Sequence, residues 1–146
     1  MTSKGHPDSA SLEEVGCEEC WDLVRSHSIG RFAANRLGAS PFVVPVNYTV
    51  EAGPAIVFRS GAGTKLNATS QDRVAIQVDE IDPIHHTGWS VLVEGFTRWL
   101  YEEQDPVDVE TWAPGDRPYV IRLTPTRVTG RRIRFTQMGT DSRGYR

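Results

Sequence analysis

Cysteine is scarce in this chain, and no hydrophobic run approaches the length of a membrane span. Cys17 and Cys20 are the only two cysteines, which argues against the disulfide framework of a small secreted protein. A bilayer span needs about 20 apolar residues, and the N-terminal MTSKGHPDSA has no apolar segment of the kind found in signal peptides. These absences predict a protein of the reducing cytoplasm.

An excess of charge of one sign is also lacking. The chain has 16 Lys and Arg against 19 Asp and Glu, a formal net charge of −3. No global field therefore draws it to nucleic acid or to an anionic membrane, and any bound anion needs a local basic site. We predict neither nucleic acid nor membrane as a partner.

The composition is that of one folded domain. A chain of 146 residues can bury about 70% of its unfolded surface, and 38% of its residues are hydrophobic. Both ends are polar and lack hydrophobic periodicity, so residues 1–10 and 137–146 are predicted to be flexible tails. Residues 11–136 are then the folded domain.

An amphipathic helix is predicted to open this domain, from Ser11 to about Ser26. Ser11 and Glu14 have the spacing of a capping box, and apolar residues follow at helical intervals. Cys17 and Cys20 form a C-x-x-C, but the two glutamates between them raise thiol pKa values rather than activate a thiolate. We interpret both as cysteines on one face of a helix.

The remainder of the chain reads as short strands joined by Gly and Pro turns. Strands are predicted at 29–35, 41–51, 55–60, 73–79, 89–101, 119–123 and 128–135, and short helices at 64–70 and 102–111. Pro125 is expected to force a bend or an edge between the last two strands. The strand at 89–101 is apolar on both faces and should be covered on both sides. This pattern favours a mainly β fold, a barrel with short helices, over a parallel sheet.

One segment has the chemistry of an anion site. It runs from a strand through Gly61-Ala62-Gly63 to a predicted helix start, and brings together Arg59, Ser60, Thr64 and Lys65. Free N–H groups at a helix start, with a guanidinium and an ammonium, suit a phosphate. The spacing matches neither a Walker loop nor a dinucleotide fingerprint. The plain alternative is a solvated Arg and Lys beside an ordinary turn.

Seven short motifs follow one another along most of the chain. They are SIGRF at 28–32, PVNY at 45–48, VFRS at 57–60, GTKL at 63–66, VDEID at 78–82, GWSVLVEG at 88–95 and TGRR at 129–132. In this order, over about residues 12–133, they resemble the FMN-binding split barrels of the pyridoxamine 5′-phosphate oxidase-like family, in its actinobacterial flavoprotein branch. The resemblance implies a split β-barrel that forms a homodimer and binds FMN noncovalently at the dimer interface.

The resemblance also implies a set of cofactor-binding positions. The phosphate positions are Arg59, Ser60, Thr64 and Lys65. Val46 and Asn47 match the strand that lies along the flavin ring. Trp89 and Ser90 match the strand that approaches the isoalloxazine, from the same subunit or from the other.

The function implied is that of an FMN-dependent oxidoreductase with an unknown small-molecule substrate. The Arg, Tyr and His set by which true pyridoxamine-phosphate oxidases hold their substrate has no match here, so vitamin B6 oxidation is not predicted. Two alternatives stay open. One is a flavin-binding carrier or sensor without turnover, and the other is a split barrel that uses F420 or haem in place of FMN.

Other candidate groups have a structural interpretation beside the functional one. His85-His86 could bind a metal, but adjacent loop histidines tend to point apart and no third ligand has a telling spacing. Asp79, Glu80 and Asp82 could be paired carboxylates or the solvated rim of a strand end.

The four tryptophans are expected to anchor a core or an interface, because their rings bury large areas. Trp112 has a second interpretation, which the family resemblance implies: the segment Trp112-Ala113-Pro114-Gly115 matches a loop of the family pattern, where Trp112 could cap a substrate pocket. The sequence leaves both interpretations open.

Overall fold

The computed structural model describes residues 8–36, 38–60, 73–101, 111–112 and 119–137. Its elements are β1 (Asp8–Val15), α1 (Cys17–Arg25), β2 (Ile29–Ala34), β3 (Phe42–Glu51), β4 (Ala55–Ser60), β5 (Arg73–Asp82), β6 (Thr87–Tyr101) and β7 (Tyr119–Gln137). The predicted helix at 64–70 and residues 102–110 of the predicted helix at 102–111 lie outside the described residues.

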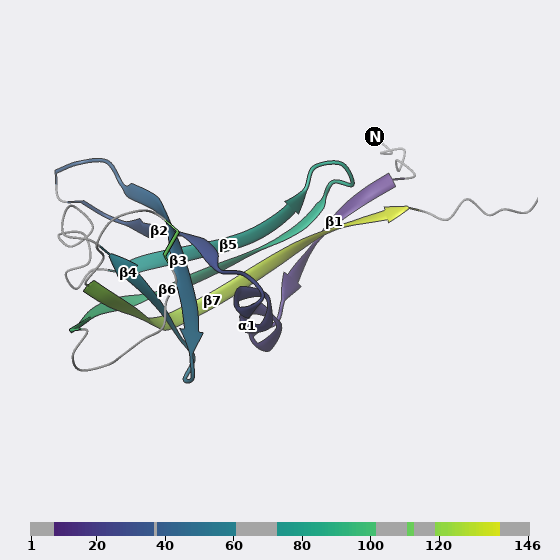
Figure 1. The fold of residues 1–146 in the computed structure, drawn as a ribbon. Coiled ribbons are helices and arrows are strands. Elements are labelled where there is room, and N and C mark those ends of the chain that lie inside the picture. Colours follow the sequence, from purple (N-terminus) through teal and green to yellow (C-terminus); the bar gives the residue numbers. More distant parts are fainter. Residues whose placement is uncertain (1–7, 37, 61–72, 102–110, 113–118, 138–146) are drawn as a thin grey trace, which may run out of the picture.

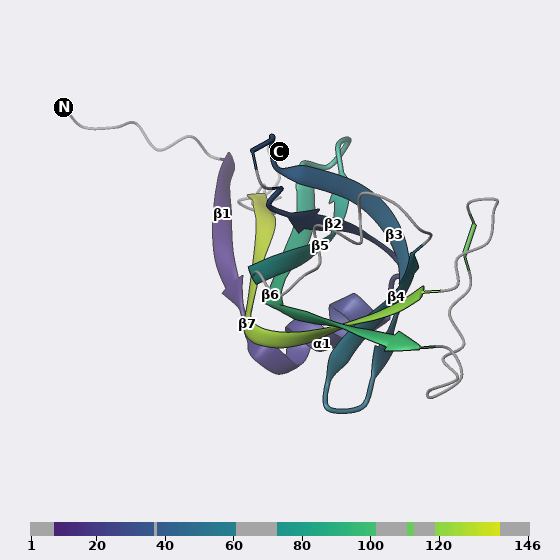
Figure 2. The ribbon, with the colours of Figure 1, turned by 90° about the vertical axis from the view of Figure 1, so that its left-hand side faces the viewer.

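Six antiparallel strands close into a barrel. The order in the sheet is β7-β4-β3-β2-β5-β6, and β6 pairs in turn with β7. Figure 2 shows these strands arranged around a common interior, with β1 added beside β7. Closure pairs the backbone groups that an open sheet would leave at its edges. The predicted class, a mainly β barrel with little helix, is confirmed.

Strand β7 is the longest of the described strands and has three partners. Its first residues pair with β4, its last residues pair with β1, and β6 runs along most of its length. Beyond the barrel, β5, β6, β7 and β1 continue side by side as an arm (Figure 1). One strand therefore joins the barrel to the arm.

The prediction of two strands separated by Pro125 was wrong, because β7 is continuous. Glu94 pairs with Arg127 while Gly95 pairs with Pro125, so Thr126 is an extra residue in the ladder. Such a bulge interrupts the regular hydrogen bonds, and a proline without an N–H is tolerated there. The break that Pro125 suggested is accommodated locally.

The prediction of one helix from Ser11 to Ser26 was also wrong. Residues 8–15 form β1, which pairs with β7 from Asp8 opposite Gln137 to Val15 opposite Gly130. Helix α1 starts only at Cys17, after Gly16, so Ser11 and Glu14 form no capping box. The open edge of β7 offers this segment a full ladder of backbone hydrogen bonds, which outweighs its weak local preference for helix.

The tail boundaries change with this strand. Residues 8–10, predicted to belong to the N-terminal tail, are part of β1. Gln137, predicted to begin the C-terminal tail, is the last residue of β7, and 138–146 lie outside the described residues.

One hydrophobic core fills the barrel. Its side chains alternate along the strands, as in Val74, Ile76 and Val78 of β5, which are 3%, 0% and 0% exposed. The largest fully buried members are Phe32, Phe58, Ile56, Ile76, Ile121 and Leu123. Burial of this kind stabilises a fold by roughly 25 cal/mol per Å² of apolar surface.

Helix α1 lies across one end of the barrel, since it contacts β3, β6 and β7, which stand on different sides of it. It buries Cys20, Trp21 and Val24 in the core, while Cys17 is exposed. Both cysteines lie in α1, as predicted, and both are free, but one is exposed and the other buried, so they do not share an environment; burial is the main cause that raises the pKa of Cys20. Among the described residues, no helix has the length and apolarity needed to cross a bilayer.

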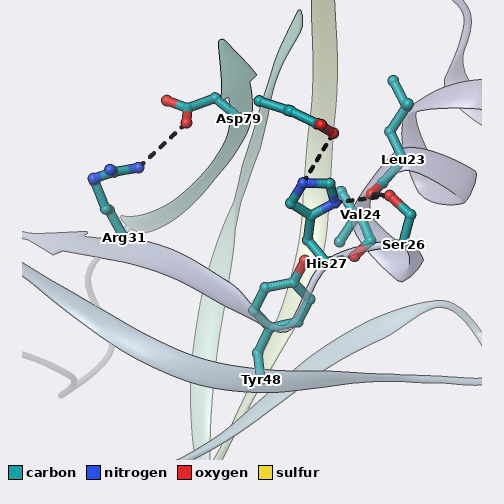
Figure 3. A network of polar contacts seen from close by, with 8 residues as sticks. Leu23, Val24, Ser26, His27, Arg31, Tyr48 and Asp79 are labelled. Atoms are coloured by element: carbon teal, nitrogen blue, oxygen red, sulfur yellow. Dashed lines mark hydrogen bonds and ion pairs between the residues drawn. The ribbon is translucent and has the colours of Figure 1, made fainter. Parts of the chain in front are cut away.

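The end of α1 is tied to the barrel by Tyr48 of β3. The phenol is 4% exposed, and its hydroxyl donates a hydrogen bond to the main-chain oxygen of Val24 (Figure 3). The same oxygen also accepts a hydrogen bond from the main-chain N–H of His27 at 3.3 Å, so the phenol is a second donor to this end of the helix. Burial also raises the pKa of Tyr48, which stays neutral and able to donate.

Replacement of this hydroxyl should destabilise the protein. We expect Tyr48→Phe to lower the free energy of unfolding by about 0.5–1.5 kcal/mol, because it removes one buried hydrogen bond while the Val24 carbonyl keeps the N–H of His27. Urea unfolding followed by circular dichroism measures the change. Ser26→Ala is the matched control, since Ser26 donates to the neighbouring Leu23 carbonyl from an exposed position and its loss should cost less than about 0.5 kcal/mol. Equal stability of Tyr48→Phe and the wild type would contradict this role.

Candidate functional site

Four of the predicted cofactor residues lie on β3 and β4 as two pairs of neighbours, Val46 with Asn47 and Arg59 with Ser60. Within each pair the two side chains face opposite sides of the sheet. Val46 is 5% exposed and Ser60 is 0% exposed, and both face the barrel interior. Successive side chains of a strand alternate between its faces, so half-buried Asn47 and Arg59 face outward. In each pair, one side chain faces the outside of the barrel.

Asn47 and Arg59 both come directly after the end of the ladder between β3 and β4. The last pair of that ladder is Tyr48 with Phe58, and Asn47 and Arg59 are the neighbours of these two residues on the same side of the pair. Arg59 in turn pairs with Val120 of β7. The structure thus brings together an amide and a guanidinium at the end of β4, whereas Thr64 and Lys65 lie outside the described residues.

Trp89 and Ser90 of β6 are not beside this pair. Ser90 lies on the outer face of β6, where it pairs with Asp79 of β5. Strand β5 pairs with β2, and β2 pairs with β3 through Ile29 and Asn47, so β5 and β2 lie between Ser90 and Asn47. Three strand spacings, about 14 Å, separate Ser90 from Asn47 within one chain. Ser90 shares the face of Asn47 without contacting it.

Trp89 faces the other way, toward the end of α1. Its ring packs against His27 with centroids 4.9 Å apart and planes at 82°. Trp89 also lines an open groove of about 640 Å³ on the inner side of the arm, together with Arg132. Nη2 of Arg132 lies 2.7 Å from Oε1 of Glu19 on α1. The groove is not lined by Asn47 or Arg59.

A polar cluster on the outer face between these positions was missed by the sequence reasoning. Gln77 Nε2 donates to Asp79 Oδ2 at 2.8 Å, and Arg31 Nη1 lies 3.5 Å from Asp79 Oδ1. Figure 3 shows Arg31 and Asp79 reaching toward each other from neighbouring strands. Alternation along the strands could have placed these side chains on one face, but their pairing depends on register between distant segments.

The three acidic residues near the end of β5 each have a partner of their own. Glu80 Oε2 lies 3.3 Å from His27 Nε2, and Asp82 Oδ2 lies 2.6 Å from His85 Nδ1. Hydrogen bonds from His85 are the largest cause that lowers the pKa of Asp82. Asp79, Glu80 and Asp82 are therefore not paired with one another.

The two loop histidines have separate surroundings. His85 contacts Asp82, while the ring of His86 lies 6.5 Å from that of Phe135. Among the described residues, no group of three or more His, Cys, Asp or Glu side chains could hold a metal ion.

Trp112 reaches the candidate site through its main chain. Its N–H donates to Oδ1 of Asn47 at 2.9 Å, across 65 residues of sequence. Its side chain is 66% exposed, so within one chain Trp112 anchors no core, in contrast to Trp21 at 6%. No local pattern signals a contact over this distance in sequence.

Similarities to known proteins bear on this site. Residues 17–132 match the sequence profile of the family described as Pyridoxamine 5′-phosphate oxidase. The uncharacterized protein Rv0080 of Mycobacterium tuberculosis strain H37Rv is 30% identical over 143 residues, which cover 89% of this chain and 91% of that protein.

Solved structures show the same arrangement. The FAD binding protein from Mycobacterium smegmatis is 29% identical with a TM-score of 0.66, over 85% of this chain and 100% of that one. An FAD-binding protein of Mesorhizobium loti has a TM-score of 0.68 over 86% of this chain and 99% of that one, and at 23% identity this likeness shows the fold alone.

Proposed function

Because the chain belongs to the pyridoxamine 5′-phosphate oxidase family, we propose that it is a flavin-binding protein, an FMN-dependent oxidoreductase acting on a small molecule. The observation that carries the proposal is the placement of Arg59 and Asn47 on the outer face of the barrel, where both flank the last pair of the ladder between β3 and β4. The 29% identity to an FAD binding protein over most of both chains supports a flavin as the cofactor class.

The residues present fit such a group. The Arg59 guanidinium supplies charge-assisted hydrogen bonds to a phosphate, and Lys65 and Thr64 extend this site on sequence grounds. The Asn47 side chain offers an amide to the polar edge of the ring. Val46 and Ser60 face inward, so they contribute main-chain groups only. One cluster of phosphate positions suits the single phosphate of FMN.

The chemistry belongs to the cofactor. Bound FMN transfers electrons or a hydride through its ring, and the protein positions that ring and tunes it by hydrogen bonds and nearby charge. In this proposal, Arg59 binds the phosphate and Asn47 orients the ring. No protein nucleophile is required.

We also propose that the protein is a homodimer through the outer face of its sheet. Val91 and Val93 of β6 are fully buried, whereas Leu92 and Phe96 on the opposite face are 36% and 44% exposed. Val43 on β3 is 59% exposed. A second copy would cover the face that one chain leaves open, and would bring Ser90 of the partner subunit toward Asn47. Trp89 packs on His27 in its own chain, so the ring contact is assigned to Ser90 alone.

Purified protein should carry a flavin. We expect a flavin absorption spectrum, release of FMN on denaturation as identified by mass spectrometry, and bleaching of the bound cofactor by NAD(P)H or another common electron donor. Release of FAD, F420 or haem would replace the cofactor assignment, and flavin that resists every donor would favour a carrier or sensor. A colourless protein that does not take up added FMN would refute the proposal.

The phosphate site can be tested separately. We expect Arg59→Ala to weaken FMN binding by about 1.5–3 kcal/mol, the range of a charge-assisted hydrogen bond, without loss of the fold. Calorimetric titration of the apoprotein measures the affinity. Arg134→Ala is the matched control, because Arg134 pairs with Glu13 on the arm and should leave FMN affinity unchanged. Equal losses in both variants would remove the assignment.

The dimer has its own prediction. Leu92→Glu should convert the protein to monomers of about 16.3 kDa in analytical ultracentrifugation, because the variant places a charge on the face that would be buried. Ile84→Glu is the control, since Ile84 is 84% exposed near the tip of the arm and lies away from this part of the face. A wild type that sediments as a monomer would contradict the dimer proposal directly.

A further inference from the structure

Trp112 is an exposed aromatic side chain whose position is set by its backbone. The main-chain N–H can only donate, so the acceptor is Oδ1 of Asn47, and the Nδ2 amino group of that amide is directed elsewhere. Packing does not hold the indole, because two thirds of the residue's surface is exposed. Asn47 therefore fixes where Trp112 lies while leaving its ring uncovered.

The place where Trp112 is fixed is the candidate site. Asn47 faces outward and, like Arg59, flanks the last pair of the ladder between β3 and β4, and the hydrogen bond brings Trp112 to Asn47 on the barrel surface. An exposed indole is a large apolar surface that gains free energy when a planar group covers it, and aromatic pairs contribute about 0.5–1.5 kcal/mol beyond burial. The isoalloxazine ring of a flavin is such a planar group.

We infer that Trp112 forms an aromatic wall of the cofactor site in contact with the flavin ring, and that Asn47 is the positioning residue that holds it there. The inference rests on the proposed flavin site and deepens it. Asn47 then makes two interactions: Oδ1 accepts the hydrogen bond from the N–H of Trp112, and Nδ2 can donate to the edge of the flavin ring. The amide carries one acceptor oxygen and one donor group, which suits both interactions at once.

The emission of bound FMN tests this contact, because an indole next to an excited flavin quenches it by electron transfer. We expect Trp112→Phe to increase the emission of bound FMN and to raise the dissociation constant about two- to tenfold. Asn47→Ala should increase the emission equally, and the double variant should emit no more than either single one. Asn47→Asp keeps an acceptor oxygen for the N–H of Trp112 but loses Nδ2, so it should bind FMN more weakly while the FMN that it does bind stays quenched as in the wild type.

Thr49→Ala is the matched control on the same strand, two residues along on the outer side, and should leave emission and affinity unchanged. Wild-type emission in Trp112→Phe, or a double variant that emits as the sum of both single ones, would overturn the inference. A Trp112→Phe variant that is monomeric but keeps wild-type emission would overturn the inference as well, because Trp112 would then be a residue of the dimer interface. If the wild type binds no flavin, the proposed function itself fails, so the two failures are distinguishable.

Discussion

Strand β7 pairs with β4 on one side and with β6 on the other, and this double pairing closes the barrel. Without it, β4 and β6 would be open edges and the interior would be accessible to water. The same strand continues past the barrel and offers its free edge to β1, so the arm depends on it too. The bulge at Thr126 lets one strand serve both parts despite Pro125.

Closure also separates two environments along every strand. Side chains that face inward form the core, and Val46 and Ser60 are committed to it. Their neighbours Asn47 and Arg59 face outward, where a ligand or a second subunit can reach them. The proposed flavin site therefore lies on the surface of the barrel and not inside it.

Local patterns were sufficient for much of the fold. Alternating apolar residues predicted β2, β3 and β4 within a residue or two, and the order of short motifs indicated the family. They failed where a distant partner decided the outcome. Residues 8–15 read as the start of a helix, yet they form a strand because the edge of β7 lies beside them. The predicted strand at 89–101 was to be covered on both faces, but a single chain covers one of them.

By itself, the sequence determined the fold class and the family, because these follow from local periodicity and from the order of motifs, and it supplied the residue types of the proposed flavin site. Only the tertiary structure decided which of these residues share a surface. Asn47 and Arg59 flank the last pair of the ladder between β3 and β4, while Ser90 lies three strands away from Asn47 and Trp89 faces α1. The contact between Asn47 and Trp112 joins positions 65 residues apart. Register and closure depend on the pairing of all strands at once, and no local segment of sequence contains that information.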